Sequence, residues 1–295
     1  MAAVAATPAD LPEAAKARGQ YARAWDRFKR NRLALVSLVF VALLVLVAIF
    51  APLIAPYGYD ETNYAAIRAG FNTDGYLLGT DQIGRDILSR MIFSLRTALI
   101  IAIGAEAVAM FLAIVIGMTA GYMGGRVDQW LMALTDILFV FPSYLLIIIL
   151  VTVFGRSELT IFVAIGISSW VGTARLVRAE VLRLRVREFV EAGKAMGANG
   201  PTIALRYILP NSLGPLLVAL SFGIPGAIIA EAGLALLGLG VQPPTPSWGT
   251  MIQEGQQWVL VSPHLLIWPT GLFALTMLAF TWIGDGLRDA FDPQE

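Results

Sequence analysis

The chain has 295 residues, of which 57% are hydrophobic and 14% are charged, and its mean hydropathy is +0.72. A soluble globular domain usually carries about 25% charged residues, so this composition excludes an ordinary soluble protein. The net charge of zero gives no support to a nucleic-acid partner, and the absence of cysteine excludes thiolate catalysis, disulfides and cysteine-ligated metals.

The first 32 residues form a polar, basic arm. Tyr21, Trp25 and Phe28 are spaced so that they share one face of a helix. The basic residues of the arm are Lys16, Arg18, Arg23, Arg27, Lys29, Arg30 and Arg32. This pattern predicts an amphipathic helix lying among the lipid headgroups, and a disordered basic tail is the alternative.

Six apolar runs follow the arm, and roughly 20 apolar residues suffice to cross a bilayer as a helix. Because the backbone must satisfy its own hydrogen bonds inside lipid, we expect helices rather than open strands. The predicted spans are Leu33–Pro56, Thr97–Tyr122, Gln129–Phe154, Leu159–Ala174, Leu213–Leu237 and Leu265–Ile283. We therefore predict an all-α integral membrane protein with six transmembrane helices, the first of which is retained rather than cleaved as a signal.

The connecting loops predict the orientation, because short cytoplasmic loops carry an excess of Lys and Arg. The arm is basic, and so is the loop between the fourth and fifth spans, whereas the loop 238–264 has no Lys or Arg. Both termini and the basic loop are therefore expected in the cytoplasm. The predicted organisation is an arm at 1–32, a first helix at 33–56, an external segment at 57–96, a five-helix domain at 97–287 and a tail at 288–295.

The sequence lacks the common catalytic motifs. It has no phosphate-binding loop of the form G-x-x-x-x-G-K-[ST], since Lys194 is the one lysine that follows a glycine and Ala195 comes after it. A single histidine, His264, excludes two-histidine metal motifs, and no G-x-S-x-G elbow is present. We therefore expect a pore, carrier or scaffold rather than an enzyme.

The basic loop contains a predicted helical hairpin, EFVEAGKAMGANGPTIALRYILPN, from Glu188 to Asn211. Residues Glu188–Ala198 favour a helix, and Gly197 with the following Asn-Gly-Pro ends it and turns the chain. A second short helix is predicted at Thr202–Ile208. Such a hairpin, rooted in two spans, would move both spans together; an ordinary connecting loop is the alternative.

Two features of the hairpin suggest how it is used. One helix face is narrow and rich in small residues, which lets another backbone approach; it consists of Phe189, Ala192, Gly193 and Met196. Pro210 lacks an N–H group and disfavours helix continuation, so Leu209 before it is expected to be extended.

The hairpin resembles the EAA motif of ABC-importer permeases. Gly193 stands where the motif has a third-position Ala, and Tyr207 stands at the usual Ile position. In that family the loop is a coupling helix that docks on the nucleotide-binding subunit. The ATPase-coupling residues that the resemblance implies are Glu188, Glu191, Ala192, Gly193, Met196, Gly197, Leu209 and Pro210.

Three other stretches strengthen the resemblance: LGTDQIGRDILSR at Leu78–Arg90, LGLGVQPPTPSWGTM at Leu237–Met251, and IGDGLRDAFDP at Ile283–Pro293. With the hairpin, they make the chain similar to the second permease subunit of dipeptide, oligopeptide and nickel ABC importers. The resemblance implies a type I importer permease in a prokaryotic cytoplasmic (inner) membrane. It implies three partners, which are a homologous permease forming a heterodimer, two ATPase subunits or one fused ATPase, and an external binding protein. ATP and Mg would bind to the ATPases, and no cofactor to this chain.

The two external loops also hold candidate residues, namely Asp81, Arg85, Asp86, Pro243, Pro244 and Trp248. Thr80 or Asp81 is the expected N-cap of the second span, and Arg85 and Asp86 would pair with the cap or with a neighbouring chain. Trp248 suits a membrane interface or a protein contact. These loops either face a partner or serve only as a capped lead-in and an interface anchor.

Three carboxylates are predicted at membrane depth: Glu106, Asp136 and Glu231. A charge there is costly, so such residues usually face the bundle interior or water, and they would line the pathway or pair across the heterodimer interface. In the fifth span, irregular backbone is predicted at Gly223, Pro225 and Gly226, as a bend near a gate or a kink needed only for packing.

The function expected from these features is that of a permease subunit which, with a homologous permease, forms the translocation path for di- or oligopeptides. Two alternatives remain at this stage. A proton-coupled secondary transporter would use the membrane carboxylates as a relay and would work without ATPase partners. A non-transporting membrane scaffold would show no solute flux.

Overall fold

The computed structural model describes residues 20–73 and 75–291, and the described part contains no strand. Its helices are α1 (Gln20–Phe28), α2 (Arg32–Ile49), α3 (Ala51–Ile54), α4 (Ile87–Met123), α5 (Gly125–Val140), α6 (Ser143–Phe154), α7 (Glu158–Leu184), α8 (Glu188–Ala195), α9 (Gly200–Thr202), α10 (Leu209–Leu236), α11 (Trp248–Gln256) and α12 (His264–Phe291). Single turns of 3₁₀ and π helix lie at Tyr64–Ala66 and Ile203–Ile208. The predicted all-α fold is confirmed. Predictions for Lys16, Arg18 and residues 292–295 lie outside the described residues.

Six membrane spans are present when one bent pair counts as a span. Five described helices (α2, α4, α7, α10 with the turns before it, and α12) are long and apolar enough to cross a bilayer, and α5 with α6 makes the sixth. The third predicted run is not a straight helix, because α5 and α6 meet at 86°. Pro142 explains the bend, since it lacks an N–H group and holds Phe141 in extended geometry with ψ of 129°.

The second span begins earlier than its apolar run predicts, at Ile87 rather than Thr97. Asp86 is its N-cap, because its side chain accepts a 2.7 Å hydrogen bond from the Ser89 N–H group. The prediction that Thr80 or Asp81 caps this helix is therefore wrong. Thr80 is buried and its hydroxyl instead accepts a hydrogen bond from the Ala69 N–H group.

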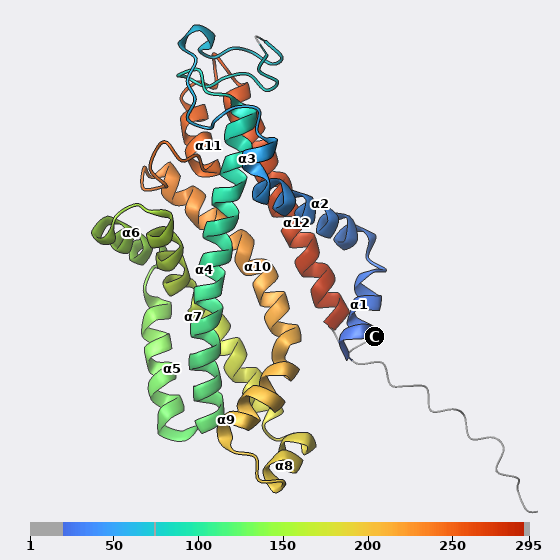
Figure 1. Ribbon diagram of the computed structural model, residues 1–295. Coiled ribbons are helices and arrows are strands. Elements are labelled where there is room, and N and C mark those ends of the chain that lie inside the picture. The colour runs from blue at the N-terminus through green and yellow to red at the C-terminus, as the bar shows by residue number, and fades with distance from the viewer. Residues whose placement is uncertain (1–19, 74, 292–295) are drawn as a thin grey trace, which may run out of the picture.

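The centre of the molecule is a close pair of long helices, α4 and α7, with α10 packed against both (Figure 1). Glycines make the approach possible: a Cβ atom at Gly117 would lie 2.5 Å from the Ala174 carbonyl oxygen, and one at Gly166 would lie 2.6 Å from that of Ala105. The remaining long helices are outside this core, where α12 packs on α10 and α2. Close backbone packing of this kind is typical of membrane helices.

The two ends of the molecule differ (Figure 1). One end carries α8 and α9 and is called the hairpin end. The other carries residues 57–73, residues 75–86 and α11, and is called the loop end. The N-terminal arm meets the C-terminal end of α12 near the hairpin end, where the Tyr21 ring packs edge-on against Phe291 and the Tyr21 hydroxyl donates to the Pro210 carbonyl. The predicted helix in the arm is confirmed, although Phe28 on its aromatic face is buried by protein.

Candidate functional site

The hairpin is built from a short helix with a well-defined stop. Gly197 follows α8 with φ of +83°, a conformation that glycine adopts without strain. Its N–H group donates to the Lys194 carbonyl at 2.9 Å, and the Ala198 N–H group donates to the Gly193 carbonyl at 3.1 Å. These two bonds form a Schellman motif, which satisfies the last carbonyls of α8 and reverses the chain. The predicted helix and glycine stop are confirmed, with the helix ending at Ala195.

The second arm of the hairpin runs into the membrane helix without interruption. The prediction of an extended Leu209 is wrong, because its φ and ψ are −55° and −47° and its N–H group donates to the Ala204 carbonyl, five residues back. The π-helical turn at Ile203–Ile208 supplies this longer bond. Pro210 follows this turn directly and does not interrupt the helix. The hairpin is therefore continuous with α10.

The inner face of the hairpin is closely packed. Val190, Ile203 and Ile208 are fully buried in a cluster that includes residues of α4 and α7. A Cβ atom at Gly193 would lie 3.0 Å from Ile203 and 3.1 Å from Tyr207. Gly193 thus lets the two arms of the hairpin touch. It is buried, whereas Phe189, Ala192 and Met196, which were predicted to share its face, are exposed.

The outer face of the hairpin is exposed and mixed in character. Glu188, Glu191 and Ala192 are exposed there, and Glu191 forms a 2.9 Å ion pair with Lys194. Met196 is 75% exposed. The exposed large apolar side chains of the hairpin and the residues just before it are Val186, Phe189, Met196 and Leu205. Sequence reasoning missed Val186 and Leu205, which are exposed because the cluster beneath them uses other positions.

The loop end contains a second, buried group of charges. Asp81 accepts a 2.6 Å hydrogen bond from Arg85 Nε and another from Arg90. Glu254 on α11 accepts from Arg90 at 3.0 Å, from Arg85 at 3.4 Å and from Gln82 at 3.0 Å. This network joins the segment before α4 to α11. Arg90 and Glu254 were not predicted, since they lie 164 residues apart and no sequence pattern connects them.

The loop 238–264 contains a helix, α11, that the sequence did not predict. Trp248 begins this helix and is fully buried, with its ring edge-on to Phe273 at 6.1 Å. Its predicted role at a membrane interface or protein contact is therefore wrong. Pro243 and Pro244 precede the helix and line a small cavity beside Arg85 and Arg90.

The structure separates the three predicted membrane carboxylates. Glu106 and Glu231 are buried within the chain, and Glu106 lies over Gly223 of α10. Asp136 is exposed and pairs with Arg175 of α7 at 2.7 Å. Their role in a pathway or an interface stays a prediction. The predicted irregularity in the fifth span does not break the helix, because α10 continues through Gly223, Pro225 and Gly226.

Comparisons with known proteins agree on one group of proteins, the membrane components of transport systems. Residues 113–294 match the family described as the binding-protein-dependent transport system inner membrane component. Residues 19–73 match the N-terminal TM domain of oligopeptide transport permease C.

Individual relatives cover nearly the whole chain. The oligopeptide transport system permease protein OppC of Haemophilus influenzae is 40% identical over 91% of this chain and 87% of its own length. The glutathione transport system permease protein GsiD of Pectobacterium atrosepticum is 39% identical, covering 92% of this chain and 90% of itself. The dipeptide permease DppC of Alkalihalophilus pseudofirmus is 38% identical, at 92% and 89% coverage. A solved inward-facing MetNI methionine ABC transporter aligns at a TM-score of 0.48 and 18% identity, over 64% of this chain and 93% of that one.

Proposed function

Since the chain belongs to the family of binding-protein-dependent transport inner-membrane components, we propose that it is one permease subunit of an ATP-driven importer of di- or oligopeptides. It pairs with a homologous permease to form the translocation path. Two ATPase subunits, or one fused ATPase, bind ATP and Mg and dock on the hairpins from the cytoplasm. An external binding protein delivers the solute to the loop end.

The main support for this proposal is the structure of the hairpin. Its inner face is packed on α4 and α7, its second arm is continuous with α10, and its outer face presents an exposed methionine with charged neighbours. A force applied to the outer face is therefore transmitted to helices that cross the membrane, because close-packed elements shift as bodies rather than deform.

The proposed mechanism is a switch between two states. ATP binding closes the ATPases and draws the two hairpins of the permease pair together. The attached helices then move the bundles from an inward-open to an outward-open arrangement, and hydrolysis returns them. This chain contributes the lever and half of the path, and ATP hydrolysis takes place on the partner subunits.

Peptides are the proposed substrates because the relatives are named for oligopeptide, dipeptide and glutathione transport. All of these solutes carry a free carboxylate and peptide-like bonds. We also propose that both termini are cytoplasmic. The contact of Tyr21 with Pro210 brings the arm to the hairpin end, and both segments are rich in Arg, which supports this orientation.

Met196→Asp tests the hairpin as the docking element. Met196 is exposed, so we expect the variant to fold and insert, but a charge in the docking contact should abolish ATP-driven uptake and the stimulation of ATPase activity by loaded binding protein. Gln129→Asp is the matched control, because it adds the same charge at an exposed position in the first half of α5, and α5 begins near the hairpin end (Figure 1). Normal uptake by the Met196 variant in reconstituted proteoliposomes would refute the assignment, and uptake that persists without the ATPases would favour a secondary transporter.

A further inference from the structure

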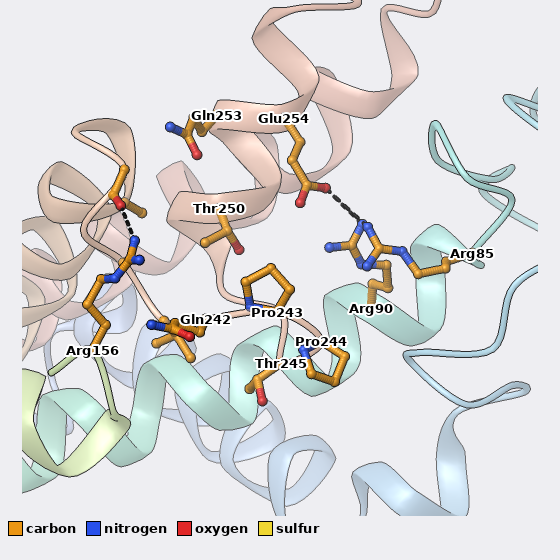
Figure 2. A pocket seen from close by; sticks show the side chains of 14 residues that line it. Arg85, Arg90, Arg156, Gln242, Pro243, Pro244, Thr245, Thr250, Gln253 and Glu254 are labelled. Carbon is orange, nitrogen blue, oxygen red and sulfur yellow. Dashed lines mark hydrogen bonds and ion pairs between the residues drawn. The ribbon is translucent and has the colours of Figure 1, made fainter.

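A small cavity lies at the loop end, bounded by the start of α4, the turn between α6 and α7, and the loop that enters α11 (Figure 2). It encloses about 120 Å³. Arg85 and Arg90 form one side and Arg156 lies on the other, with Pro243 and Pro244 between them (Figure 2). The neutral polar side chains on its wall are Gln242, Thr245, Thr250 and Gln253.

The cavity has more positive than negative charge. Among its described lining residues three are arginines, and Glu254 alone is acidic. Asp81, behind the wall, balances one further arginine through its bonds to Arg85 and Arg90. Arg156 makes no ion pair within the described part of the chain, and its Nη1 atom donates to the Gly238 carbonyl at 2.7 Å. One guanidinium charge is therefore left without an acidic partner.

The three arginines differ in their availability to a ligand. Arg90 is buried and donates to Asp81 and Glu254, so it belongs to the wall of the cavity. Arg156 is exposed, so its guanidinium group is accessible to a bound anion. Carboxylates are the acceptors that guanidinium groups bind best, because two oxygens match the fork of N–H donors.

We propose that this cavity binds the terminal carboxylate of the transported solute as it enters the path. The inference rests on the proposed function and specifies its substrate class: peptides or peptide-like molecules with a free carboxylate. Arg156 supplies the unpaired charge, Thr250 and the two glutamines offer donors and acceptors for the adjoining peptide group, and the Arg85–Arg90–Glu254 network holds the wall.

The cavity is large enough for a peptide terminus. By the same measure a single water molecule needs about 10–15 Å³, so about 120 Å³ accommodates a carboxylate and the atoms beside it. Such a site would distinguish free peptides from their amides while tolerating many side chains.

The test uses the complete complex with its binding protein in proteoliposomes. The probe is a mixture of tripeptides in which every sequence is present both as the free acid and as the C-terminal amide. The measurement is the acid-to-amide ratio of ATP-driven uptake, divided by the same ratio for binding to the isolated binding protein. We expect the corrected ratio to be about ten for the wild type and to fall to about one in Arg156→Gln, as for the loss of one charge-assisted hydrogen bond.

Two variants serve as controls. Arg156→Lys keeps the charge and should retain most of the preference for the acid. Arg96→Gln removes an exposed arginine of α4 that does not line the cavity, and its corrected ratio should equal that of the wild type. A corrected ratio of one for the wild type, or an unchanged ratio in Arg156→Gln, would overturn the inference. Failure of the proposed function would look different, because the wild type would then take up neither form with ATP.

Discussion

At the scale of single residues, two glycines of α10 have opposite environments. Gly223 lies under the Glu106 carboxylate, and a Cβ atom built on it would be 2.2 Å from Glu106 Oε2. Gly226, one turn later, has no atom within 4 Å of the same position. Gly223 is therefore required by packing against α4, whereas Gly226 is not required by any contact within this chain.

Alanine substitutions at these two glycines should separate packing from backbone effects. Both gain about 1 kcal/mol of helix propensity, so their difference isolates the contact with Glu106. We expect Gly223→Ala to be less stable than Gly226→Ala by about 1–3 kcal/mol, the usual cost of overpacking. Thermal unfolding of the purified permease in nanodiscs measures the difference, and Glu106→Ala should remove it. Equal melting temperatures for the two glycine variants would show that the Glu106 side chain moves away from the added methyl group at little energetic cost.

The sequence predicted some of these residues better than others. The glycine stop at Gly197 was predictable because the helix signal ends there and glycine alone adopts its conformation freely. The burial of Trp248 was not predictable, because a tryptophan near a membrane boundary suits both an interface and a core. Its place depends on α11, which packs on α10 and α12.

At the scale of helices, two ion pairs join α5 to α7. Arg178 donates to both oxygens of Asp128, at 2.5 and 2.6 Å, and Arg175 pairs with Asp136 farther along the same two helices. The other faces of α5 expose large apolar side chains, including Trp130 and Val140. Those faces suit lipid or the partner permease.

A double-mutant cycle on Asp128→Asn and Arg178→Gln measures the coupling energy of the ion pair between these two residues, which we call the clamp. The pair is bidentate and partly shielded, so we expect a coupling energy of about 1 kcal/mol, reduced from that of a buried pair by solvent screening. The exposed pair of Glu191 and Lys194 is the comparison, for which a coupling of about 0–0.5 kcal/mol is expected. Equal couplings for the two pairs would mean that α5 does not depend on the clamp.

Helix prediction was accurate where apolar runs were long. It was inaccurate where tertiary packing decides whether a helix forms and where it begins. The hairpin and the spans follow from composition and turn residues. The early start of α4 and the helix α11 lie in polar segments, and they form because a buried network of Arg85, Arg90 and Glu254 connects them. The bend at Pro142 was visible as a proline, but the apolar run around it concealed the consequence.

At the scale of the whole molecule, the hairpin that is the proposed lever and the cavity beside Arg156 lie at opposite ends (Figure 1). The long helices α4, α7 and α10 connect them, and the hairpin packs on all three. A movement at the hairpin end is thus conveyed to the loop end by rigid elements rather than by a chain of weak contacts. This arrangement is what an importer driven from one side and loaded from the other requires.

The central claim is that the hairpin is a cytoplasmic lever covered by a separate ATPase. The chain has no cysteine, so Met196→Cys introduces a single thiol at its exposed tip. We expect a membrane-impermeant maleimide to label this thiol in inverted vesicles stripped of the ATPases, to label it far more slowly when the ATPases are bound, and not to label it in intact cells. Labelling in intact cells, or equal rates in vesicles with and without the ATPases, would contradict the account.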